Sequence, residues 1–201
     1  MSFDFVYLAS GSPRRRELLQ QIGVPFRLVS VAVDEAVLQG ETPAAYVNRL
    51  AVAKADAGWQ RSGGADGIPV LAADTAVVHD GQIFGKPGGR ADAESMLRRL
   101  SGRTHEVLTA VALRTARGTE CRLTRSEVTL RAIDAVEARA YWETGEPRDK
   151  AGGYAVQGRA AIFITDLRGS YSGVVGLPLF ETAQLLVESG IAPWQSTAET
   201  P

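Results

Sequence analysis

The sequence predicts a mixed α/β fold, built on a central mixed, twisted sheet with helices on its faces. Two patterns along the 201 residues point to this class. Stretches typical of strands alternate with stretches typical of helices, as in sheets that helices cover. In the middle of the chain, Asp80-Gly81 lies between two apolar dipeptides and predicts a β-hairpin, so that part of the sheet is antiparallel.

In the first third of the chain, apolar runs predict strands. A serine or threonine followed by a proline predicts the start of a helix. Ser12 and Thr42 are good N-caps, and the proline after each lacks the N–H that a first helical residue leaves unpaired. Gly23 ends the first of these helices. The predicted strands span residues 5–9, 26–33 and 70–73.

The alternation continues to the end of the chain. Glycines at 102 and 190 end predicted helices, and Gly118 joins two β-rich runs into a strand pair. We expect a single domain over residues 1–194 and a frayed polar tail over 195–201. The further predicted helices cover 91–100, 136–142 and 177–188, the strands 77–78, 83–84, 105–114, 121–132 and 162–167, and a polar loop 145–153.

Composition excludes several classes of function. Lys and Arg number 22 against 23 Asp and Glu, so the chain lacks the basic surplus of proteins that hold nucleic acid. One cysteine, Cys121, and two histidines exclude an intrachain disulfide, a cysteine-rich zinc site and a three-histidine metal site. The opening residues are not a secretory signal and no apolar run reaches membrane-spanning length, so we expect a cytoplasmic protein.

The turn that begins at Ser10 is the first candidate for chemistry. A predicted strand runs into a Gly/Ser turn and then into a helix whose first turn carries Arg14, Arg15 and Arg16. Free N–H groups at a helix N-terminus favour an anion, whereas arginines there oppose the helix macrodipole. A bound phosphate group reconciles the two. The alternative is a solvated basic turn that pairs with nearby acids.

Acidic residues at predicted strand ends are the second candidate. Asp34 and Glu35 follow the second predicted strand, and Asp74 follows the strand over 70–73. Strand ends form the rim of a sheet, where α/β folds place their ligands. Carboxylates there can hold Mg²⁺ together with substrate phosphates, or take a proton from an attacking water. For any single one of them, a turn-capping role is the simpler interpretation.

Two lysines and one loop complete the candidates. Lys54 and Lys86 can each serve as a point charge for phosphate, or be an ordinary surface residue. The segment 146–158 is charged and rich in glycine, as binding loops often are, although a long solvated loop is the alternative. Its Gln157 offers both a donor and an acceptor, which suits the edge of a nucleobase.

These segments together resemble the Maf family of nucleoside triphosphate pyrophosphatases. So many ordered matches are far more specific than any single motif, and they cover almost the whole chain. They are Ala9-Ser10-Gly11-Ser12-Pro13-Arg14-Arg15, Val33-Asp34-Glu35, Ala53-Lys54-Ala55, Ala72-Ala73-Asp74-Thr75, Gly85-Lys86-Pro87, Leu100-Ser101-Gly102-Arg103-Thr104-His105, Asp149-Lys150-Ala151-Gly152-Gly153-Tyr154, Val156-Gln157-Gly158, Gly169-Ser170-Tyr171 and Val174-Val175-Gly176-Leu177-Pro178.

The resemblance implies a Maf/ITPase-like fold with two lobes around a cleft. It also implies hydrolysis of a nucleoside triphosphate to the monophosphate and pyrophosphate, with a divalent metal cation, Mg²⁺ or Mn²⁺. By resemblance, Asp74 accepts the proton of the attacking water, and Glu35 and Asp74 hold the metal. The residues implied to bind the phosphates are Ser10, Arg15, Lys54, Lys86, Asp149 and Lys150.

Three positions that divide the family by substrate are Arg14, Thr75 and Gln157. This combination resembles the branch that acts on dTTP and UTP, and modified pyrimidine nucleotides fall in the same class. A 7-methyl-GTP pyrophosphatase of the same family, and a non-enzymatic nucleotide-binding regulator of septum formation, stay open as alternatives. The resemblance also implies a homodimer and a link to cell-division arrest and nucleotide-pool cleaning. Arg159-Ala160-Ala161, where relatives carry glycines, departs from the family pattern.

Overall fold

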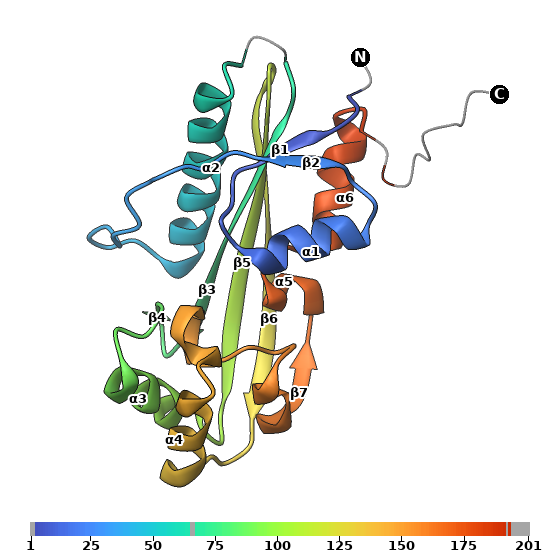
Figure 1. The fold of residues 1–201 in the computed structure, drawn as a ribbon. Coiled ribbons are helices and arrows are strands. Elements are labelled where there is room, and N and C mark those ends of the chain that lie inside the picture. Colours follow the sequence, from blue (N-terminus) through green and yellow to red (C-terminus); the bar gives the residue numbers. More distant parts are fainter. Residues whose placement is uncertain (1–2, 65–66, 192, 194–201) are drawn as a thin grey trace, which may run out of the picture.

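One mixed sheet organises the chain, of which this computed structural model describes residues 3–64, 67–191 and 193. Within those residues the sheet has seven strands in the order β2-β1-β3-β5-β6-β7, with β4 paired to β3 (Figure 1). The strands are β1 (Val6–Leu8), β2 (Phe26–Leu28), β3 (Val70–His79), β4 (Gln82–Phe84), β5 (Thr104–Thr115), β6 (Gly118–Leu130) and β7 (Ile164–Arg168). The helices are α1 (Pro13–Gln21), α2 (Pro43–Arg61), α3 (Arg90–Leu100), α4 (Ala135–Glu143), α5 (Tyr171–Val175) and α6 (Leu179–Glu188).

The pairing of the strands confirms the mixed sheet that the sequence predicts. β1 runs parallel to β2 and to β3, whereas β3 pairs antiparallel with β4 and β5, and β6 pairs antiparallel with β5 and β7. The predicted hairpin joins β3 to β4 through Asp80 and Gly81, with φ angles of 50° and 72°. Positive φ at both positions matches the twist of the flanking strands.

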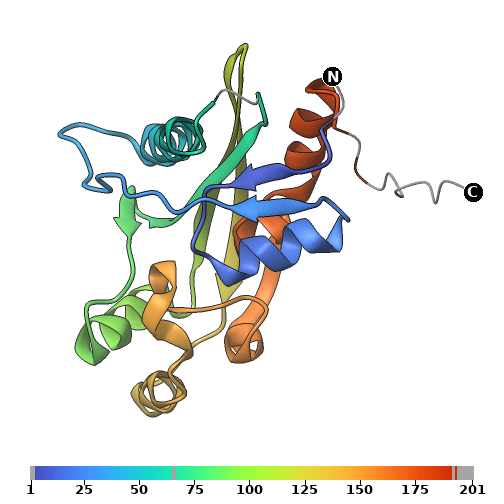
Figure 2. The same ribbon diagram turned by 45° about the horizontal axis from the view of Figure 1, so that its top comes forward.

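The long strands β3, β5 and β6 run the length of the molecule and carry elements at both ends (Figures 1 and 2). β1, β2, α1, α2 and α6 surround one end, and α3, α4 and β7 surround the other. This arrangement matches the two lobes that the family resemblance implies.

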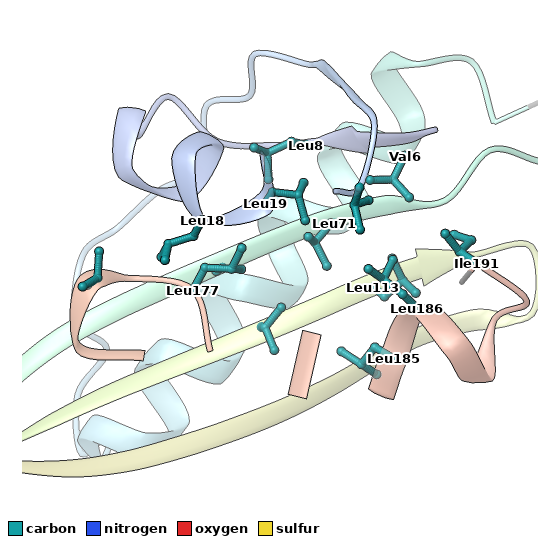
Figure 3. Close-up of a cluster of buried hydrophobic side chains, with 14 of the residues drawn as sticks. Val6, Leu8, Leu18, Leu19, Leu71, Leu113, Leu177, Leu185, Leu186 and Ile191 are labelled. Atoms are coloured by element: carbon teal, nitrogen blue, oxygen red, sulfur yellow. The ribbon is translucent and has the colours of Figure 1, made fainter. Parts of the chain in front are cut away.

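Side chains of β3 alternate between two layers of core. Leu71 packs with α1 and α6 in the apolar cluster of Figure 3, and Val70 packs under α2. Successive residues of a strand point to opposite faces. Further along the strand, the consecutive residues Asp74 and Thr75 therefore also point to opposite faces of the sheet.

Several predicted boundaries are wrong because tertiary contacts decide them. The strand predicted over 26–33 ends at Leu28, since its only partner, β1, ends at Leu8. The strand predicted to end at residue 73 continues to His79, so Asp74 lies inside β3 and not at its end. β3 pairs with β5 from Val70 to Val78. Because this pairing includes Asp74, the strand continues beyond that residue.

Other differences lie in the last third of the chain. The predicted polar loop and the start of the last predicted strand form short 3₁₀ turns at 146–149, 151–153 and 159–163. Helix α5 was not predicted; its N-cap Ser170 accepts a hydrogen bond from the Gly173 amide at 3.0 Å. The predicted frayed tail lies outside the described residues. No helix among those described combines the length and apolar character that crossing a membrane requires.

Helix α2 approaches the sheet most closely at Gly58. A Cβ at this position would lie 2.7 Å from Val70 Cγ1, 3.1 Å from Ala9 Cβ and 3.3 Å from Val29 Cγ1. Those neighbours are buried and have little room to move. The absence of a side chain at Gly58 therefore sets how near α2 comes to β1 and β3.

We expect Gly58→Ala to lower the free energy of unfolding by about 1 kcal/mol, because overpacking outweighs the gain in helix propensity. Urea denaturation of both proteins measures the difference. Gly88→Ala is the control, since a Cβ there would meet only Asp92 Oδ2 at 3.9 Å. A Gly58 variant as stable as the control would contradict close packing at this position.

Candidate active site

A cleft of about 810 Å³ opens where one edge of β3 lacks a neighbouring strand. β1 pairs with β3 only at Val70 and Leu71, and β4 pairs with it only from Val77 to His79. The edge between those two contacts faces the cleft. The cleft is lined by all eleven residues that the family resemblance implies for the site, but not by Arg16 or Asp34, which the sequence also offers as candidates. The eleven are Ser10, Arg14, Arg15, Glu35, Lys54, Asp74, Thr75, Lys86, Asp149, Lys150 and Gln157.

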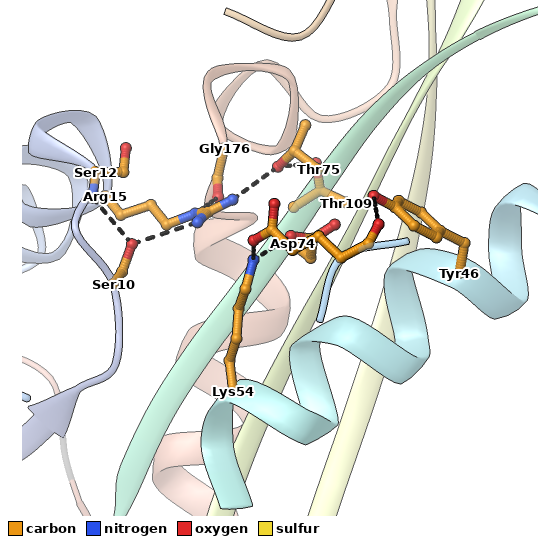
Figure 4. Close-up of polar contacts among 10 residues, drawn as sticks. Ser10, Ser12, Arg15, Tyr46, Lys54, Asp74, Thr75, Thr109 and Gly176 are labelled. Atoms are coloured by element: carbon orange, nitrogen blue, oxygen red, sulfur yellow. Dashed lines mark hydrogen bonds and ion pairs between the residues drawn. The ribbon is translucent and has the colours of Figure 1, made fainter. Parts of the chain in front are cut away.

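Asp74 meets Lys54 on the α2 face of the sheet (Figure 4). The Thr42 side chain caps α2 by accepting from the Ala45 amide at 3.2 Å, which confirms the predicted helix start. Lys54 Nζ lies 2.7 Å from Asp74 Oδ1 and 2.6 Å from Glu35 Oε1. The side chains of Lys54 and Asp74 are 13% and 10% exposed, whereas that of Glu35 is 54% exposed. One ammonium thus joins a buried carboxylate to an exposed one.

The two carboxylates differ in how readily they bind a proton. Burial raises the pKa of Asp74, against the opposing charges of Lys54 and Arg15. The hydrogen bond from Lys54 lowers the pKa of Glu35, with smaller contributions from other nearby cations. Asp74 is therefore the better proton acceptor of the pair, and Glu35 is the carboxylate that stays ionised.

The segment that carries Glu35 is held to α2 by residues that sequence reasoning missed. Tyr46 donates its hydroxyl hydrogen to the Glu35 carbonyl at 3.1 Å. Arg49 binds both carboxylate oxygens of Glu41, at 2.6 and 2.8 Å, and donates to the Ala36 carbonyl at 2.9 Å. Asp34, by contrast, accepts from the Ala36 amide at 2.9 Å and caps its own turn, which confirms the simpler interpretation for that residue.

Arg15 anchors the turn between β1 and α1 (Figure 4). Its Nε donates to the Gly176 carbonyl at 2.7 Å, Nη1 to Ser10 Oγ at 3.3 Å and Nη2 to Thr75 Oγ1 at 3.2 Å. Burial lowers the pKa of this guanidinium. All three acceptors are uncharged, and Arg15 forms no ion pair within the described residues, so its charge is available to a bound anion.

The predicted cap of α1 is correct in position but not in chemistry. Ser12 is the N-cap residue, yet its side chain makes no capping hydrogen bond. The Ser12 amide instead donates to Ser10 Oγ at 3.2 Å, so Ser10 organises the turn. Arg15 also donates to the Ser10 hydroxyl, and this local contact holds the hydroxyl beside the start of the helix.

Thr75 points to the other face of the sheet and joins a second network. Its Oγ1 lies 3.0 Å from Oγ1 of Thr109, which is fully buried on β5. Thr109 Oγ1 also donates to the Gly173 carbonyl at 2.7 Å. The sequence signal for this network is weak, because it consists of one threonine among the buried apolar residues of β5 and one glycine of a helix that was not predicted.

The remaining wall of the cleft comes from the polar segment after α4. Lys150 pairs with Asp149, and the Gly152 amide donates to the Gly85 carbonyl at 3.0 Å, which brings this segment beside the Lys86 turn. Gly152 has a φ of +69°, and a Cβ there would lie 3.0 Å from Val77. Only glycine combines that backbone conformation with so close an approach.

Tyr154, Arg14 and Gln157 also line the cleft, and His105 supports Tyr154 from behind it. Tyr154 bonds to Nε2 of His105 at 2.7 Å, and both side chains are buried. Burial, with a smaller contribution from His79, lowers the pKa of His105 to about 4, so the imidazole is neutral at pH 7. Burial also lowers the pKa of Arg14, against the charge of Asp149. Gln157 is exposed at the cleft and available to a ligand.

Residues 5–189 match the family model described as Maf-like protein. The chain belongs to the Maf family. It is 53% identical over 186 residues to the dTTP/UTP pyrophosphatase of Alkalilimnicola ehrlichii. The alignment covers 91% of this chain and 92% of the relative. It is also 53% identical over 201 residues to the dTTP/UTP pyrophosphatase of Nitrosospira multiformis, with coverage of 94% and 97%.

A more distant likeness links this Maf chain to a solved structure from Mycobacterium abscessus, described as a nucleoside-triphosphatase or dITP/XTP pyrophosphatase. The two share 18% sequence identity and a TM-score of 0.42, over 94% of each chain.

The raised pKa of Asp74 predicts how this Maf protein responds to Asp74→Asn. Asp74 contributes its full stability below the ordinary pKa of the group, and the contribution is lost as pH rises through the raised folded-state pKa. The Asp74→Asn variant does not lose stability in this way, because the amide side chain does not ionise. Its free energy of unfolding, relative to wild type, should therefore rise between pH 4 and pH 7, without metal or substrate.

Urea unfolding at both pH values measures the difference, and Asp166→Asn on exposed β7 is the matched control. At pH 7 we expect Asp74→Asn to be no less stable than wild type within about 1 kcal/mol, the error of such extrapolations. A relative stability that falls from pH 4 to pH 7 would show that the ion pair with Lys54 outweighs burial.

Proposed function

We propose that this Maf-family protein is a nucleoside triphosphate pyrophosphatase that hydrolyses dTTP and UTP to the monophosphate and pyrophosphate. The observation that carries the proposal is the buried Asp74 carboxylate beside Lys54, in a cleft that also holds Arg15, whose hydrogen bonds within the described part of the chain go to uncharged acceptors. Relatives named dTTP/UTP pyrophosphatase, 53% identical over nearly the full length, support it.

Asp74 is the group that would take the proton of the attacking water. Burial raises its pKa, so it is more basic than an ordinary aspartate, while the contact with Lys54 favours its charged form. Lys54 holds the carboxylate in one orientation. A fixed base that adjoins the phosphorus centre lowers the barrier by positioning as well as by proton transfer.

The cationic side chains of the cleft would hold the triphosphate. Phosphoryl chemistry depends mainly on positioning and on neutralising charge. The cleft is lined by Arg15 with its partner Ser10 and by Lys86 and Lys150, with Asp149 beside Lys150. This arrangement suits pyrophosphate as the leaving group.

Glu35 and Asp74 fit a hard divalent cation, Mg²⁺ or Mn²⁺. Both carboxylates reach the same ammonium of Lys54, so their oxygens face one region of the cleft. The described residues hold no cluster of three or more metal-ligating side chains, and Mg²⁺ commonly takes one or two carboxylates with substrate phosphates. A bound ion would supply charge stabilisation at the phosphate oxygens.

We propose that specificity for the base depends on Arg14, Thr75 and Gln157. They line the same cleft as the proposed phosphate-binding residues. Arg14 donates only, and Gln157 both donates and accepts, which suits a pyrimidine with two carbonyl groups. Modified pyrimidine nucleotides fall within the proposal. The homodimer, the cytoplasmic location and the link to septum formation and nucleotide-pool cleaning stay predictions.

A nucleotide panel tests the proposed activity. Pyrophosphate release is measured from dTTP, UTP, CTP, ATP, GTP and 7-methyl-GTP, each with Mg²⁺, Mn²⁺ or a chelator. We expect dTTP and UTP to exceed the others at least about tenfold in kcat/KM, since the site discriminates through hydrogen bonds, and we expect the chelator to abolish release. Fastest release from 7-methyl-GTP would favour the alternative branch. Binding without release would favour a regulator.

Asp74→Asn tests the proposed base. Because removal of a general base slows turnover by about 10²–10⁴-fold, we expect a loss of that size in kcat with dTTP and UTP. Circular dichroism checks that the variant is folded, and Asp166→Asn, which lies outside the cleft, should turn over like wild type. A folded Asp74 variant with the kcat of wild type would overturn this assignment.

A further inference from the structure

We propose that Tyr141 and Glu146 are positioning residues for base recognition: together they fix the backbone on both sides of Gln157 and so hold its side chain at the cleft. The inference rests on the proposed function and deepens it, because it says what places one of the residues proposed to recognise the base. Gln157 lines the cleft, whereas Tyr141 and Glu146 do not.

The Gln157 side chain extends from a turn that belongs to no strand or α-helix. The Gly158 amide donates to the Ala155 carbonyl at 3.1 Å, which closes this turn around Gln157. Val156 packs in the apolar core, but Gln157 itself is exposed, so its own packing does not fix it. The position of the Gln157 side chain therefore depends on what anchors the two ends of the turn.

Tyr141 anchors the end that precedes Gln157. Its hydroxyl oxygen accepts from the Ala155 amide at 3.2 Å, and both residues are buried. The same hydroxyl donates its one hydrogen to Glu146 Oε1 at 2.7 Å. The Tyr141 ring meets Phe163 edge to face, with 5.6 Å between the ring centroids. The Tyr141 hydroxyl thus satisfies a buried amide of the turn and contacts the second anchor.

Glu146 anchors the end that follows Gln157. Its Oε2 accepts from the Arg159 amide at 3.0 Å, and its Oε1 accepts from the Ala160 amide at 3.4 Å. These two amides begin a 3₁₀ turn, where N–H groups lack acceptors within the turn itself. Burial would raise the pKa of Glu146, but the hydrogen bonds that the carboxylate accepts lower it overall. The ionised carboxylate can therefore accept from every donor around it.

Gly158 shows how closely the carboxylate approaches the turn. The φ of −107° at this position does not require glycine. A Cβ there, however, would lie 2.5 Å from both Cδ and Oε1 of Glu146. Only a residue without a side chain lets Glu146 come this near, so the glycine is needed for space.

The bond between Tyr141 and Glu146 joins the two anchors into one chain of hydrogen bonds that spans the turn. Gln157 lies between the ends of this chain. A glutamine amide that moves freely can offer either its donor or its acceptor to a base. A fixed one can distinguish the O4 carbonyl of uracil from the amino group of cytosine, because position decides which group meets the base.

A double-mutant cycle tests the proposal by measuring kcat/KM for UTP and CTP. The proteins are wild type, Tyr141→Phe, Gln157→Ala and the double variant. Phenylalanine keeps the ring but removes the hydroxyl that both anchors share. We expect Tyr141→Phe to lower the preference for UTP over CTP about fivefold, the worth of one hydrogen bond. In the Gln157→Ala protein the same change should alter the preference by less than about twofold, because its effect acts through Gln157.

Ser101→Ala is the matched control for Tyr141→Phe. The Ser101 hydroxyl also makes two hydrogen bonds, since it accepts from the Ile133 amide at 2.7 Å and donates to the Ile133 carbonyl at 3.2 Å, but it does not line the cleft. This variant should keep the wild-type preference. Equal losses for UTP and CTP in Tyr141→Phe, or effects that add in the double variant, would mean that Tyr141 only supports the fold and would overturn the proposal.

Glu146→Gln tests the second anchor and decides the matter if Tyr141→Phe does not fold. The variant keeps the size of the side chain, but its NH₂ group can only donate, so at least one bonded donor loses its acceptor. We expect the same fall in preference and faster hydrogen exchange at the amides of 155–160, with exchange in α6 unchanged. Wild-type exchange and preference would overturn the proposal. Failure of the proposed function looks different, because wild type would then release no pyrophosphate from UTP itself.

Discussion

The ion pair between Asp74 and Lys54 is the constraint on which the site depends. A carboxylate inside a buried strand requires a partner, because an unpaired buried charge is strongly destabilising. Among the residues that the structure describes, α2 supplies that partner through Lys54, whose Nζ lies 2.7 Å from Asp74 Oδ1. The helix must therefore lie in one register against β3, and the absent side chain at Gly58, one turn beyond Lys54, allows it to come that close.

The alternation of side chains along β3 divides the site into two halves. Asp74 points toward α2, where Lys54 and Glu35 form the set of charges suited to chemistry at phosphorus. Thr75 points to the opposite face, where Arg15 and Thr109 form a network of hydrogen bonds suited to recognition. A ligand can reach both halves because neither β1 nor β4 covers this edge of β3.

Sequence reasoning located local features well where neighbouring residues decide them. The Asp80-Gly81 hairpin and the Thr42 cap both formed as predicted, since each depends on backbone geometry within four residues. It failed at Ser12, whose hydroxyl does not cap, and at Asp74, which was placed at a strand end. At Ser12 the competing contact is local, since Ser10 accepts from the Ser12 amide, whereas at Asp74 another element, β5, extends the strand.

The sequence by itself determined the alternation of strands and helices, the family, and the eleven residues gathered in the cleft, because these follow from local periodicity and from motifs that can be read in order. Tertiary structure alone decided how they are used. It buried Asp74 and so raised its pKa, gave Arg15 only uncharged partners, and set Thr109 opposite Thr75. Burial and hydrogen-bond direction depend on which segments meet across the sheet, and no local pattern encodes those contacts.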